Sequence, residues 1–318
     1  MNIILGIDTS NYTTSLAIMS EEGELLANLK KLLPVKIGEC GLRQSDAVFA
    51  HIKNLPELFC EAKQILAENK IVAVGVSKRP RNLDGSYMPC FLAGKTVASS
   101  LALSSNVPLY EFSHQCGHIM AALYSSGDLE LEDKKFAAFH ISGGTTELLR
   151  IEGVENGFSA EHIGGTKDLN AGQVIDRVGV LMGLGFPCGR EMEALALANT
   201  KKVPKRKVSR DGLFVNLSGL ENITKKLYDE SNDKNLTSAF VFECIGNAIC
   251  DLSTEYIEKY GDTHFVYAGG VMCNSIIKSK LEDRFSCSFA APEMSSDNAV
   301  GIAYLSRKSY LKDKLNLR

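Results

Sequence analysis

The residues with the clearest capacity for chemistry are His114 and His118, in the segment His-Gln-Cys-Gly-His. Side chains four residues apart on a helix lie on the same face, so the two imidazoles are spaced to bind one metal ion. The segment lacks the glutamate of His-Glu-x-x-His, the general base of zinc peptidases, which argues against proteolysis. Cys116 points off the shared face and is not expected to be a ligand. On the residues alone, two solvent-facing or hydrogen-bonded histidines are the alternative to a metal site.

Three turns rich in glycine and hydroxyl side chains form a second group of candidates. They span residues 8–14, 142–146 and 269–270, each after an apolar run, and the third leads to a helix start near Asn274. Glycine lets the backbone approach a ligand closely, and exposed amide groups at turns and helix N-termini favour anions. Together the turns predict a nucleotide cleft between two domains. The sequence has neither a Walker lysine motif nor Gly-x-Gly-x-x-Gly, so neither a P-loop nor a Rossmann site is expected.

The elements that must position these residues alternate between strands and helices. Residues 3–19 and 136–151 each predict two strands around a small turn, and their shared pattern indicates duplicated halves. The other expected elements are helices at 45–68, 91–103 and 236–260 and strands at 71–76, 107–110 and 264–268. Thr237 or Ser238 is the expected cap of the longest helix. Alternating strands and helices predict an α/β architecture.

Length and composition limit the class of protein. The chain has 318 residues, 45% of them hydrophobic, which is enough for about two domains with cores of their own. The net charge of −3 argues against a surface coated by nucleic acid but allows local basic patches. No basic leader precedes the first strand and no apolar run approaches the ~18 residues of a membrane helix, so a soluble, unexported protein is expected. Nine scattered cysteines, from Cys40 to Cys287, predict reduced thiols in the cytoplasm.

Eight motifs in order give the chain a resemblance to a known family. They are Asp8-Thr-Ser10, His114-x-x-x-His118, Ile141-Ser-Gly-Gly144, the run from Asp168 to Arg177, Phe186-Pro-Cys-Gly189, Leu217-Ser-Gly-Leu220, Ala268-Gly-Gly-Val-Met-Cys-Asn274 and Ser296-Asp-Asn-Ala299. They resemble the motifs of the TsaD or Gcp family, the transferase subunit of bacterial tRNA threonylcarbamoyladenosine synthase, once described as a glycoprotease. The resemblance runs almost from end to end.

This resemblance implies an actin, Hsp70 and sugar-kinase type (ASKHA) fold, in which two related α/β domains flank a nucleotide cleft. The first domain is expected at residues 1–110 and the second, with the metal and nucleotide sites, at 111–318. A last helix at about 297–312 is expected to pack back on the first domain. The resemblance also implies that Asp297 joins His114 and His118 in holding one Fe2+ or Zn2+ ion. Two imidazoles and one carboxylate leave coordination positions open for substrate oxygens.

The other site residues also come from the resemblance. It implies that His140, Ile141, Ser142, Gly143 and Gly144 line the substrate and that Asp176, Gly189 and Asn274 contact the adenylate, or a bound ATP or ADP. Weaker candidates are Asp8, Ser10, Asp168, Gly172, Gly269 and Gly270. Without the family context, Asp176 could equally be an acidic residue on a helix surface, and Asn274 could equally be a helix cap.

The implied reaction is transfer of a threonylcarbamoyl group from threonylcarbamoyl-AMP to N6 of the adenosine beside the anticodon, in tRNAs reading codons that begin with A. Acyl transfer to a weak exocyclic amine needs activation and alignment of the electrophile more than a protein nucleophile. The resemblance also implies tRNA and threonylcarbamoyl-AMP as substrates and TsaB-type and TsaE-type proteins as partners, and the protein is expected in the cytoplasm. No membrane association is expected.

Several departures from the family pattern keep other functions open. Residues 11–14 replace a first hairpin that usually carries two carboxylates, Thr145 replaces a histidine, Glu147 a glutamine and Leu169 an aspartate, and residues 77–85 replace a Gly-Pro-Gly-Leu loop. One alternative is a diverged carbamoyl-type transferase with another acceptor. Another is a non-catalytic partner subunit of the same fold, although the retained metal residues disfavour it. The basic runs at 201–210 and 78–81 are either contacts for tRNA phosphates or solvated loops.

Overall fold

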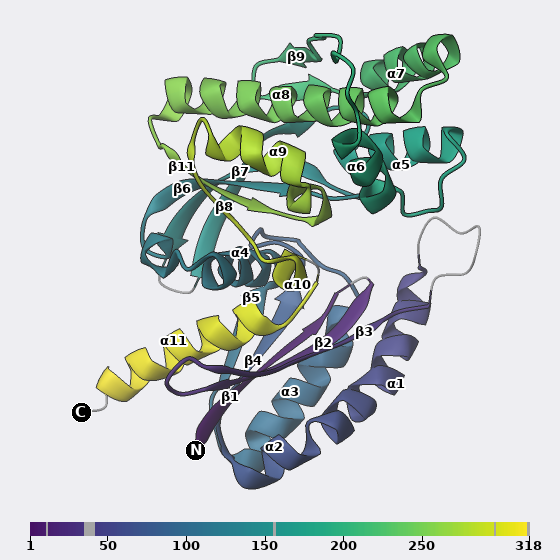
Figure 1. Ribbon diagram of the computed structural model, residues 1–318. Helices are drawn as coiled ribbons and strands as arrows, with labels where there is room; N and C mark the ends of the chain where they lie inside the picture. Colours follow the sequence, from purple (N-terminus) through teal and green to yellow (C-terminus); the bar gives the residue numbers. More distant parts are fainter. Residues whose placement is uncertain (11, 35–41, 155–156, 296, 317–318) are drawn as a thin grey trace. The chain divides into compact units, whose positions relative to one another are not determined.

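The computed structural model describes residues 1–10, 12–34, 42–154, 157–295 and 297–316. Asn11, Cys40 and Ser296, named above, lie outside the described residues. The chain divides into two compact units (Figure 1). Unit 1 comprises Met1–Asp133, Gly153–Ser159 and Glu293–Arg318, and unit 2 comprises Lys134–Glu152 and Ala160–Pro292. Unit 1 therefore extends past the expected boundary at residue 110 and includes His114 and His118.

Unit 1 is built on a mixed sheet of five strands. They are β1 (Asn2–Thr9), β2 (Thr13–Ser20), β3 (Leu25–Leu32), β4 (Lys70–Arg79) and β5 (Leu109–Ser113), in the order β3-β2-β1-β4-β5. β1, β2 and β3 are antiparallel, whereas β4 and β5 continue the sheet parallel to β1. β1 and β2 pair from Ile3↔Ser20 to Thr9↔Thr14, so the first predicted hairpin is confirmed. The carboxyl ends of three parallel strands meet at one edge, and this edge carries the chemistry described below.

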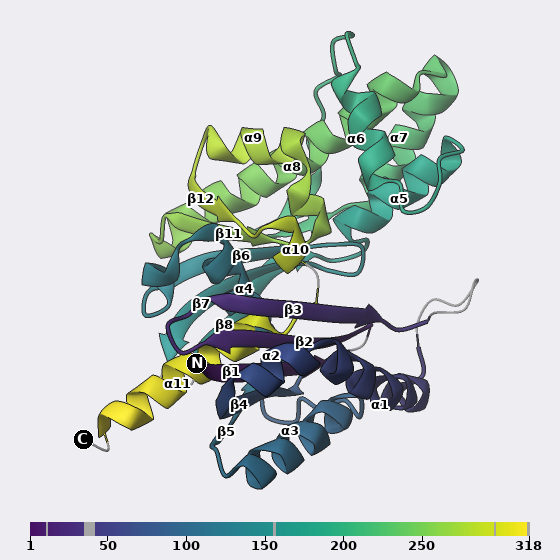
Figure 2. The same ribbon diagram turned by 60° about the horizontal axis from the view of Figure 1, so that its bottom comes forward.

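Helices cover both faces of this sheet. The helices are α1 (Gln44–Glu61), α2 (Lys63–Glu68), α3 (Phe91–Ser105), α4 (His114–Ser126), η1 (Leu129–Leu131), α10 (Pro292–Ser295) and α11 (Val300–Asn316). α1 and α3 pack against the side chains of Ile3, Leu5 and Ile7. α11 lies on the opposite face, where a Cβ on Gly6 would be 2.6 Å from the Ala303 backbone nitrogen. In Figure 1 the strands of unit 1 lie between α11 and the α1–α3 layer, and Figure 2 shows the same order from below.

Unit 2 repeats the strand order of unit 1 within a larger sheet. Its strands are β6 (Lys135–Ile141), β7 (Thr146–Val154), β8 (Gly157–Thr166), β9 (Ser209–Asp211), β10 (Phe214–Asn216), β11 (His264–Ala268) and β12 (Ser286–Phe289), in the order β12-β11-β6-β7-β8-β10-β9. β6 and β7 form the second predicted hairpin, and β11 and β12 continue parallel to β6. The segment β8-β7-β6-β11-β12 thus corresponds to β3-β2-β1-β4-β5, as expected for duplicated halves.

The helices of unit 2 are α5 (Ala171–Leu181), α6 (Gly189–Leu197), α7 (Ser218–Ser231), α8 (Lys234–Tyr260), η2 (Gly270–Cys273) and α9 (Ser275–Glu282). The predicted cap of α8 is wrong: Asp233 caps it by accepting a hydrogen bond from the Leu236 N–H, and Thr237 and Ser238 are buried inside the helix. Among the described residues α8 is the one helix long and apolar enough to cross a membrane. However, 78% of its most apolar window is buried in the protein, which is typical of a core helix.

Candidate functional site

The histidine pair lies on the first two turns of α4, in unit 1. β5 ends at Ser113, whose side chain caps α4 by accepting a hydrogen bond from the Cys116 N–H. The helix then places His114 and His118 on one face, with ring centroids 4.3 Å apart. Cys116 is 2% exposed and its thiol lies 3.4 Å from the Phe158 carbonyl oxygen, away from the imidazoles. The two imidazoles are therefore direct neighbours, and the cysteine between them is a packing residue.

Asp297 lies beside both imidazoles although it is far from them in the sequence. It stands between α10 and α11, in a part of unit 1 that packs on α4. Its Oδ1 is 3.0 Å from His118 Nε2 and 3.5 Å from His114 Nε2. The three residues each offer one ligand atom, and these atoms lie within 4.8 Å of one another. Their side chains are 15–24% exposed, so the cluster is recessed but open to a ligand.

Asp8, at the end of β1, holds His114 from the other side. The carboxylate is fully buried, and its Oδ1 is 2.8 Å from His114 Nδ1. Ser77, which the pairing of β1 with β4 brings alongside, donates its hydroxyl hydrogen bond to the same oxygen. When the His114 Nδ1–H is donated to Asp8, the Nε2 lone pair is available on the side of Asp297. Asp8, a weaker candidate for substrate contact, is thus placed behind the imidazole.

Neighbouring charges and hydrogen bonds in this cluster shift the pKa values of His114 and Asp297. Burial lowers the pKa of His114, but the charges of Asp8 and Asp297 outweigh burial and raise this pKa to about 10. Burial raises the pKa of the Asp297 carboxyl, yet hydrogen bonds from both histidines hold it well below its usual range. The residues fit a divalent cation, because a metal ion would replace the His114 proton as the positive partner of the carboxylates.

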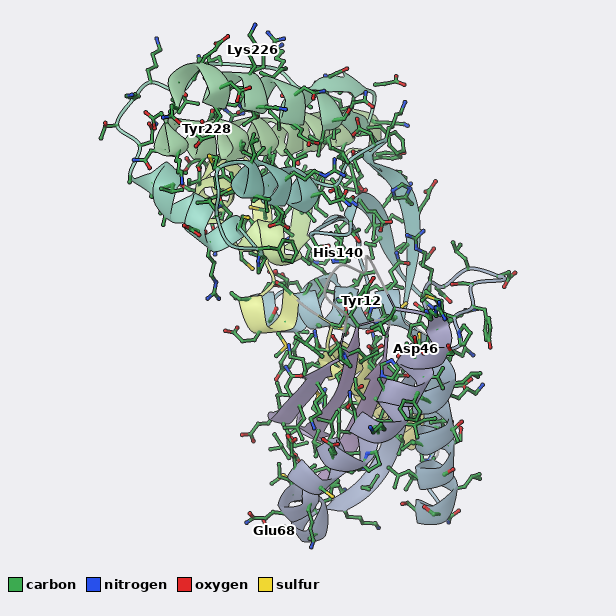
Figure 3. All side chains as sticks on the ribbon, turned by 90° about the vertical axis from the view of Figure 1, so that its right-hand side faces the viewer. Tyr12, Asp46, Glu68, His140, Lys226 and Tyr228 are labelled. Atoms are coloured by element: carbon green, nitrogen blue, oxygen red, sulfur yellow. The ribbon has the colours of Figure 1, made fainter. Side chains whose placement is uncertain are left out.

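The residues expected to line the substrate lie in unit 2, at the turn between β6 and β7. His140 and Ile141 end β6, where Ile141 is buried and His140 is partly exposed (Figure 3). The Ser142 N–H closes the turn by donating to a carbonyl three residues later at 2.8 Å. Gly143 and Gly144 are exposed, and a Cβ on either would meet nothing within 4 Å. Packing does not require glycine here, so these positions leave the backbone open to a ligand.

Two other glycines bring neighbouring elements against this turn. Gly172, in the first turn of α5, donates its N–H to the Ser142 carbonyl at 3.2 Å, and a Cβ there would lie 2.7 Å from Gly143. Gly269 has a φ of +101°, and its Cβ would lie 2.3 Å from the Ile141 carbonyl oxygen. Close packing therefore accounts for glycine at both positions, whereas Gly270 is exposed and open.

The residues expected at the nucleotide lie on α5, α6 and α9, which hydrogen bonds tie together. Asp176 on α5 accepts a hydrogen bond at 2.9 Å from the Cys188 N–H, directly before Gly189 at the start of α6. Glu193 on α6 accepts the Ser275 N–H at 2.7 Å, at the start of α9, and also binds its hydroxyl. Asp176 and Gly189 are thus brought together, and Glu193 connects them to α9.

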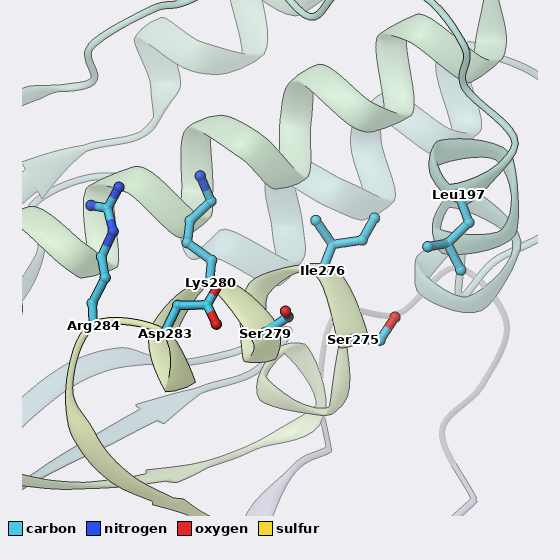
Figure 4. A pocket seen from close by; sticks show the side chains of 7 residues that line it. All are labelled: Leu197, Ser275, Ile276, Ser279, Lys280, Asp283 and Arg284. Carbon is cyan, nitrogen blue, oxygen red and sulfur yellow. The ribbon is translucent and has the colours of Figure 1, made fainter.

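Asn274 and a cavity mark the start of α9. Asn274 caps this helix by accepting the Ile277 N–H at 3.0 Å and is 6% exposed. Directly after it, a cavity of about 470 Å3 lies between α6 and α9 (Figure 4). Its lining consists of Leu197, Ser275, Ile276, Ser279, Lys280, Asp283 and Arg284. The cavity is shallow and open to solvent, and its volume lies within the range of small-molecule sites.

Two weaker candidates have evident structural roles. Asp168 accepts the N–H groups of Leu217 and Ser218 at 2.7 and 3.1 Å, which satisfies the start of α7. Burial raises the pKa of Asp168, but hydrogen bonds from Ser218 and from backbone N–H groups outweigh it and lower this pKa to about 2. Ser10 is 2% exposed, and its carbonyl accepts the Nε2–H of His51 at 2.8 Å.

Glu193 and Ser77 are not among the residues whose roles were predicted from the sequence. Glu193 follows Gly189 by four residues, the spacing that places two residues on one helix face, and this is the signal that could have found it. Ser77 begins the segment that replaces the family's Gly-Pro-Gly-Leu loop, but in the structure it lies in β4. Its contact with Asp8 depends on strand pairing between residues 69 positions apart, which the sequence does not display.

Solved structures with the same fold resemble this chain over nearly its whole length. HypF of T. kodakarensis has 13% identity and a TM-score of 0.62, covering 97% of this chain and 48% of its own. Full-length HypF in its phosphate- and nucleotide-bound form has 15% identity and a TM-score of 0.59, covering 99% and 56%. Component A of (R)-2-hydroxyglutaryl-CoA dehydratase from Acidaminococcus fermentans has 17% identity and a TM-score of 0.57, covering 98% and 100%. The chain spans about half the length of these HypF chains.

At such identities the likeness shows the fold alone, which is of the ASKHA type, so the predicted fold class is confirmed. The family is shown by sequence. The profile described as TsaD, tRNA N6-adenosine threonylcarbamoyltransferase, matches residues 40–304, from before the histidine pair to beyond Asp297. The chain belongs to the TsaD family, a family of metal-dependent transferases that act on tRNA.

Proposed function

We propose that this protein is a tRNA N6-adenosine threonylcarbamoyltransferase, which transfers the threonylcarbamoyl group of threonylcarbamoyl-AMP to the adenosine beside the anticodon in tRNAs reading codons that begin with A. The observation that carries the proposal is the cluster of His114, His118 and Asp297 in a member of the TsaD family. A scaffold subunit of the same fold has no need of two imidazoles and a carboxylate converging within 4.8 Å.

The proposed chemistry needs an activated carbamoyl carbon and an aligned amine. Fe2+ or Zn2+ bound by His114, His118 and Asp297 would supply Lewis-acid polarisation of the carbamoyl oxygen. Asp8 acts behind this set, because it keeps the His114 Nδ1–H engaged and so fixes the tautomer that offers Nε2. We assign no protein nucleophile, and Cys116, the thiol nearest in sequence, points away from the cluster.

The nucleotide end of the substrate is assigned to unit 2. Residues 140–144 line the acyl phosphate, where the open amides of Gly143 and Gly144 suit phosphate oxygens. Asp176, Gly189 and Asn274 contact the adenylate, or a bound ATP or ADP. The cavity that begins at Ser275, directly after Asn274, supports this assignment, because Glu193 of α6 binds the same Ser275.

Substitution of one proposed ligand tests the metal mechanism. His118→Ala should lose bound metal and abolish modification of tRNA in a reaction with purified protein, substrate and partner proteins. His264→Gln is the matched control, because this imidazole lies on β11 of unit 2 and is occupied by the hydroxyls of Ser286 and Ser288 at 3.0 Å. Full modification of tRNA by the His118→Ala variant would refute the metal mechanism.

A second candidate is a related carbamoyl-type transferase with another acceptor. It is motivated by the departures at Thr145, Leu169, Tyr12 and residues 77–85. Tyr12 directly precedes β2 and is 42% exposed (Figure 3), where the family usually has acidic residues. Deletion of the gene followed by complementation separates the candidates. Restoration of the modified adenosine by this chain as the single copy supports the tRNA acceptor, and failure to restore it supports the other.

The proposed function includes cytoplasmic partners. We assign a TsaB-type and a TsaE-type protein as partners, and tRNA as the substrate. The non-catalytic alternative predicts a chain that binds neither metal nor nucleotide, so metal analysis and nucleotide titration of the purified protein test it directly. Bound metal that is lost on His118→Ala would exclude that alternative.

A further inference from the structure

One segment of unit 2, residues 201–210, differs from the rest of the chain in charge. We call it the basic strap. It contains Lys201, Lys202, Lys205, Arg206, Lys207 and Arg210 and no acidic residue. The strap contributes +6 to a chain whose net charge is −3, so the other residues together stand at −9. The strap is therefore strongly basic, whereas the rest of the chain is net acidic.

The basic strap is held in place by an ion pair at each end and by apolar packing against unit 2. Lys201 pairs with Asp233 at 2.7 Å, and Arg210 pairs with Glu255. Val203 and Val208 pack against the core of unit 2, and the last residues of the strap enter β9, which pairs with β10. An anchored segment presents its charges without a large loss of conformational entropy on binding.

The cations between the two anchored ends have no acidic partner. Lys202, Lys205, Arg206 and Lys207 are exposed, and within the described part of the chain none of them makes an ion pair. Like charges at this density repel one another, and a polyanion relieves the repulsion by replacing small counterions. This arrangement of charges is typical of a surface that binds a polyanion.

A series of contacts within unit 2 connects the basic strap to the proposed substrate turn. Arg206 and Lys207 line a cavity of about 290 Å3 together with Ser218 and Gly219 at the start of α7. Asp168 accepts the Ser218 N–H at the start of α7. Gly172, four residues after Asp168, lies in α5 and contacts the turn at residues 142–144.

We propose that the basic strap binds the phosphate backbone of the substrate tRNA, through Lys205, Arg206 and Lys207 in particular. This inference rests on the proposed function, which makes tRNA the acceptor. A membrane surface fits less well, because the apolar side chains of the strap, Val203 and Val208, face the core and the strap contains no aromatic residue to insert into lipid. Backbone contacts of this kind position an RNA without reading its sequence.

The test compares two triple variants of the full chain. Lys205→Gln/Arg206→Gln/Lys207→Gln removes three cations of the strap. Lys53→Gln/Lys63→Gln/Lys70→Gln removes three exposed lysines of unit 1 that make no ion pair with the described residues, and it has the same net charge. The dissociation constant for tRNA is measured for both variants and the parent protein between 50 and 200 mM salt.

Three lost phosphate contacts lower the magnitude of the slope of log K against log salt by about 2.1 to 2.7. The parent protein should therefore lose roughly 20- to 40-fold more affinity than the strap variant across this fourfold salt range. The control variant should keep the parent slope, and both variants should keep metal content and nucleotide affinity. Unchanged metal and nucleotide binding separates a defect of the strap from a failure of the proposed catalytic site.

An unaltered slope and affinity in the strap variant would overturn the inference, as would a parent protein that does not bind tRNA at all. Binding to vesicles rich in anionic lipid is measured in parallel. Strap-dependent vesicle binding without strap-dependent tRNA binding would assign the strap to a membrane and refute the RNA assignment. If strap-dependent tRNA binding is found but no adenosine is modified, the strap assignment stands and the proposed reaction fails.

Discussion

The substitution Asp8→Asn tests how far the metal centre depends on a residue that does not bind the metal itself. Asp8 is fully buried, and its Oδ1 accepts hydrogen bonds from His114 at 2.8 Å and from Ser77. Asparagine has nearly the same shape and can still accept both hydrogen bonds through its carbonyl oxygen. What the substitution removes is the negative charge behind the imidazole, so the measurement isolates that charge.

The expected effect follows from the change in the hydrogen bond to His114. A hydrogen bond to a charged group contributes about 1.5–3 kcal/mol and a neutral one about 0.5–1.5, so the loss is about 1–1.5 kcal/mol. That corresponds to roughly tenfold weaker metal binding, at the lower end of the range known for outer-shell carboxylates. Asp8 also helps to raise the pKa of His114 to about 10, so the metal must displace a proton that Asp8 favours. The dication interacts with the carboxylate more strongly than the proton does, so the net effect remains a loss of affinity.

Metal affinity is measured on metal-free protein at pH 7.5 by competition with a chromophoric zinc chelator, with thermal unfolding in parallel. Asp46→Asn is the control, because Asp46 lies exposed in the first turn of α1 in the same unit (Figure 3). Equal zinc affinity for the Asp8→Asn and Asp46→Asn variants, with both folded, would show that the buried carboxylate does not support the metal site. The reasoning from hydrogen-bond geometry would then be wrong.

Two further predictions concern unit 2. Gly172→Ala should lower the free energy of unfolding by about 1–3 kcal/mol and weaken nucleotide binding, because the new Cβ would lie 2.6–2.7 Å from backbone atoms of Ser142 and Gly143. Denaturant unfolding and nucleotide titration measure the two effects, and a variant as stable as the parent protein would contradict the packing argument. Asp168→Asn should cost about 1 kcal/mol at pH 7, after discounting for solvent exposure, because the pKa of Asp168 is lowered from 3.8 to about 2. The stabilisation is present above pH 4 and lost as pH falls toward 2, so the stability difference between the two proteins should vanish over that range; a difference independent of pH would exclude this origin.

Local patterns predicted the elements because each depends on neighbouring residues. The hairpins around Asp8 and Ser142 and the strand His264–Ala268 were found from alternation and turn residues, and they are present. The cap of α8 was predicted wrongly because Asp233 lies before the repeating apolar residues of the helix, whereas the predicted caps, Thr237 and Ser238, lie among them. The histidine pair was also a local signal, since a spacing of four on one helix needs no knowledge of the fold.

The remaining parts of the site depend on contacts between distant elements, which no local pattern records. Asp297 reaches His118 across 179 residues because α11 packs back on α4, and only the family resemblance identified it beforehand. Asp8 illustrates the converse. The sequence placed it in a glycine- and hydroxyl-rich turn, where an exposed carboxylate would face a ligand. In the sheet it is fully buried between Ser77 and His114, so its chemistry acts through the imidazole. Burial disfavours an unpaired carboxylate, so a buried carboxylate that binds an imidazole needs a positive charge nearby. The evident function of Asp8 is therefore to hold that positive centre in place.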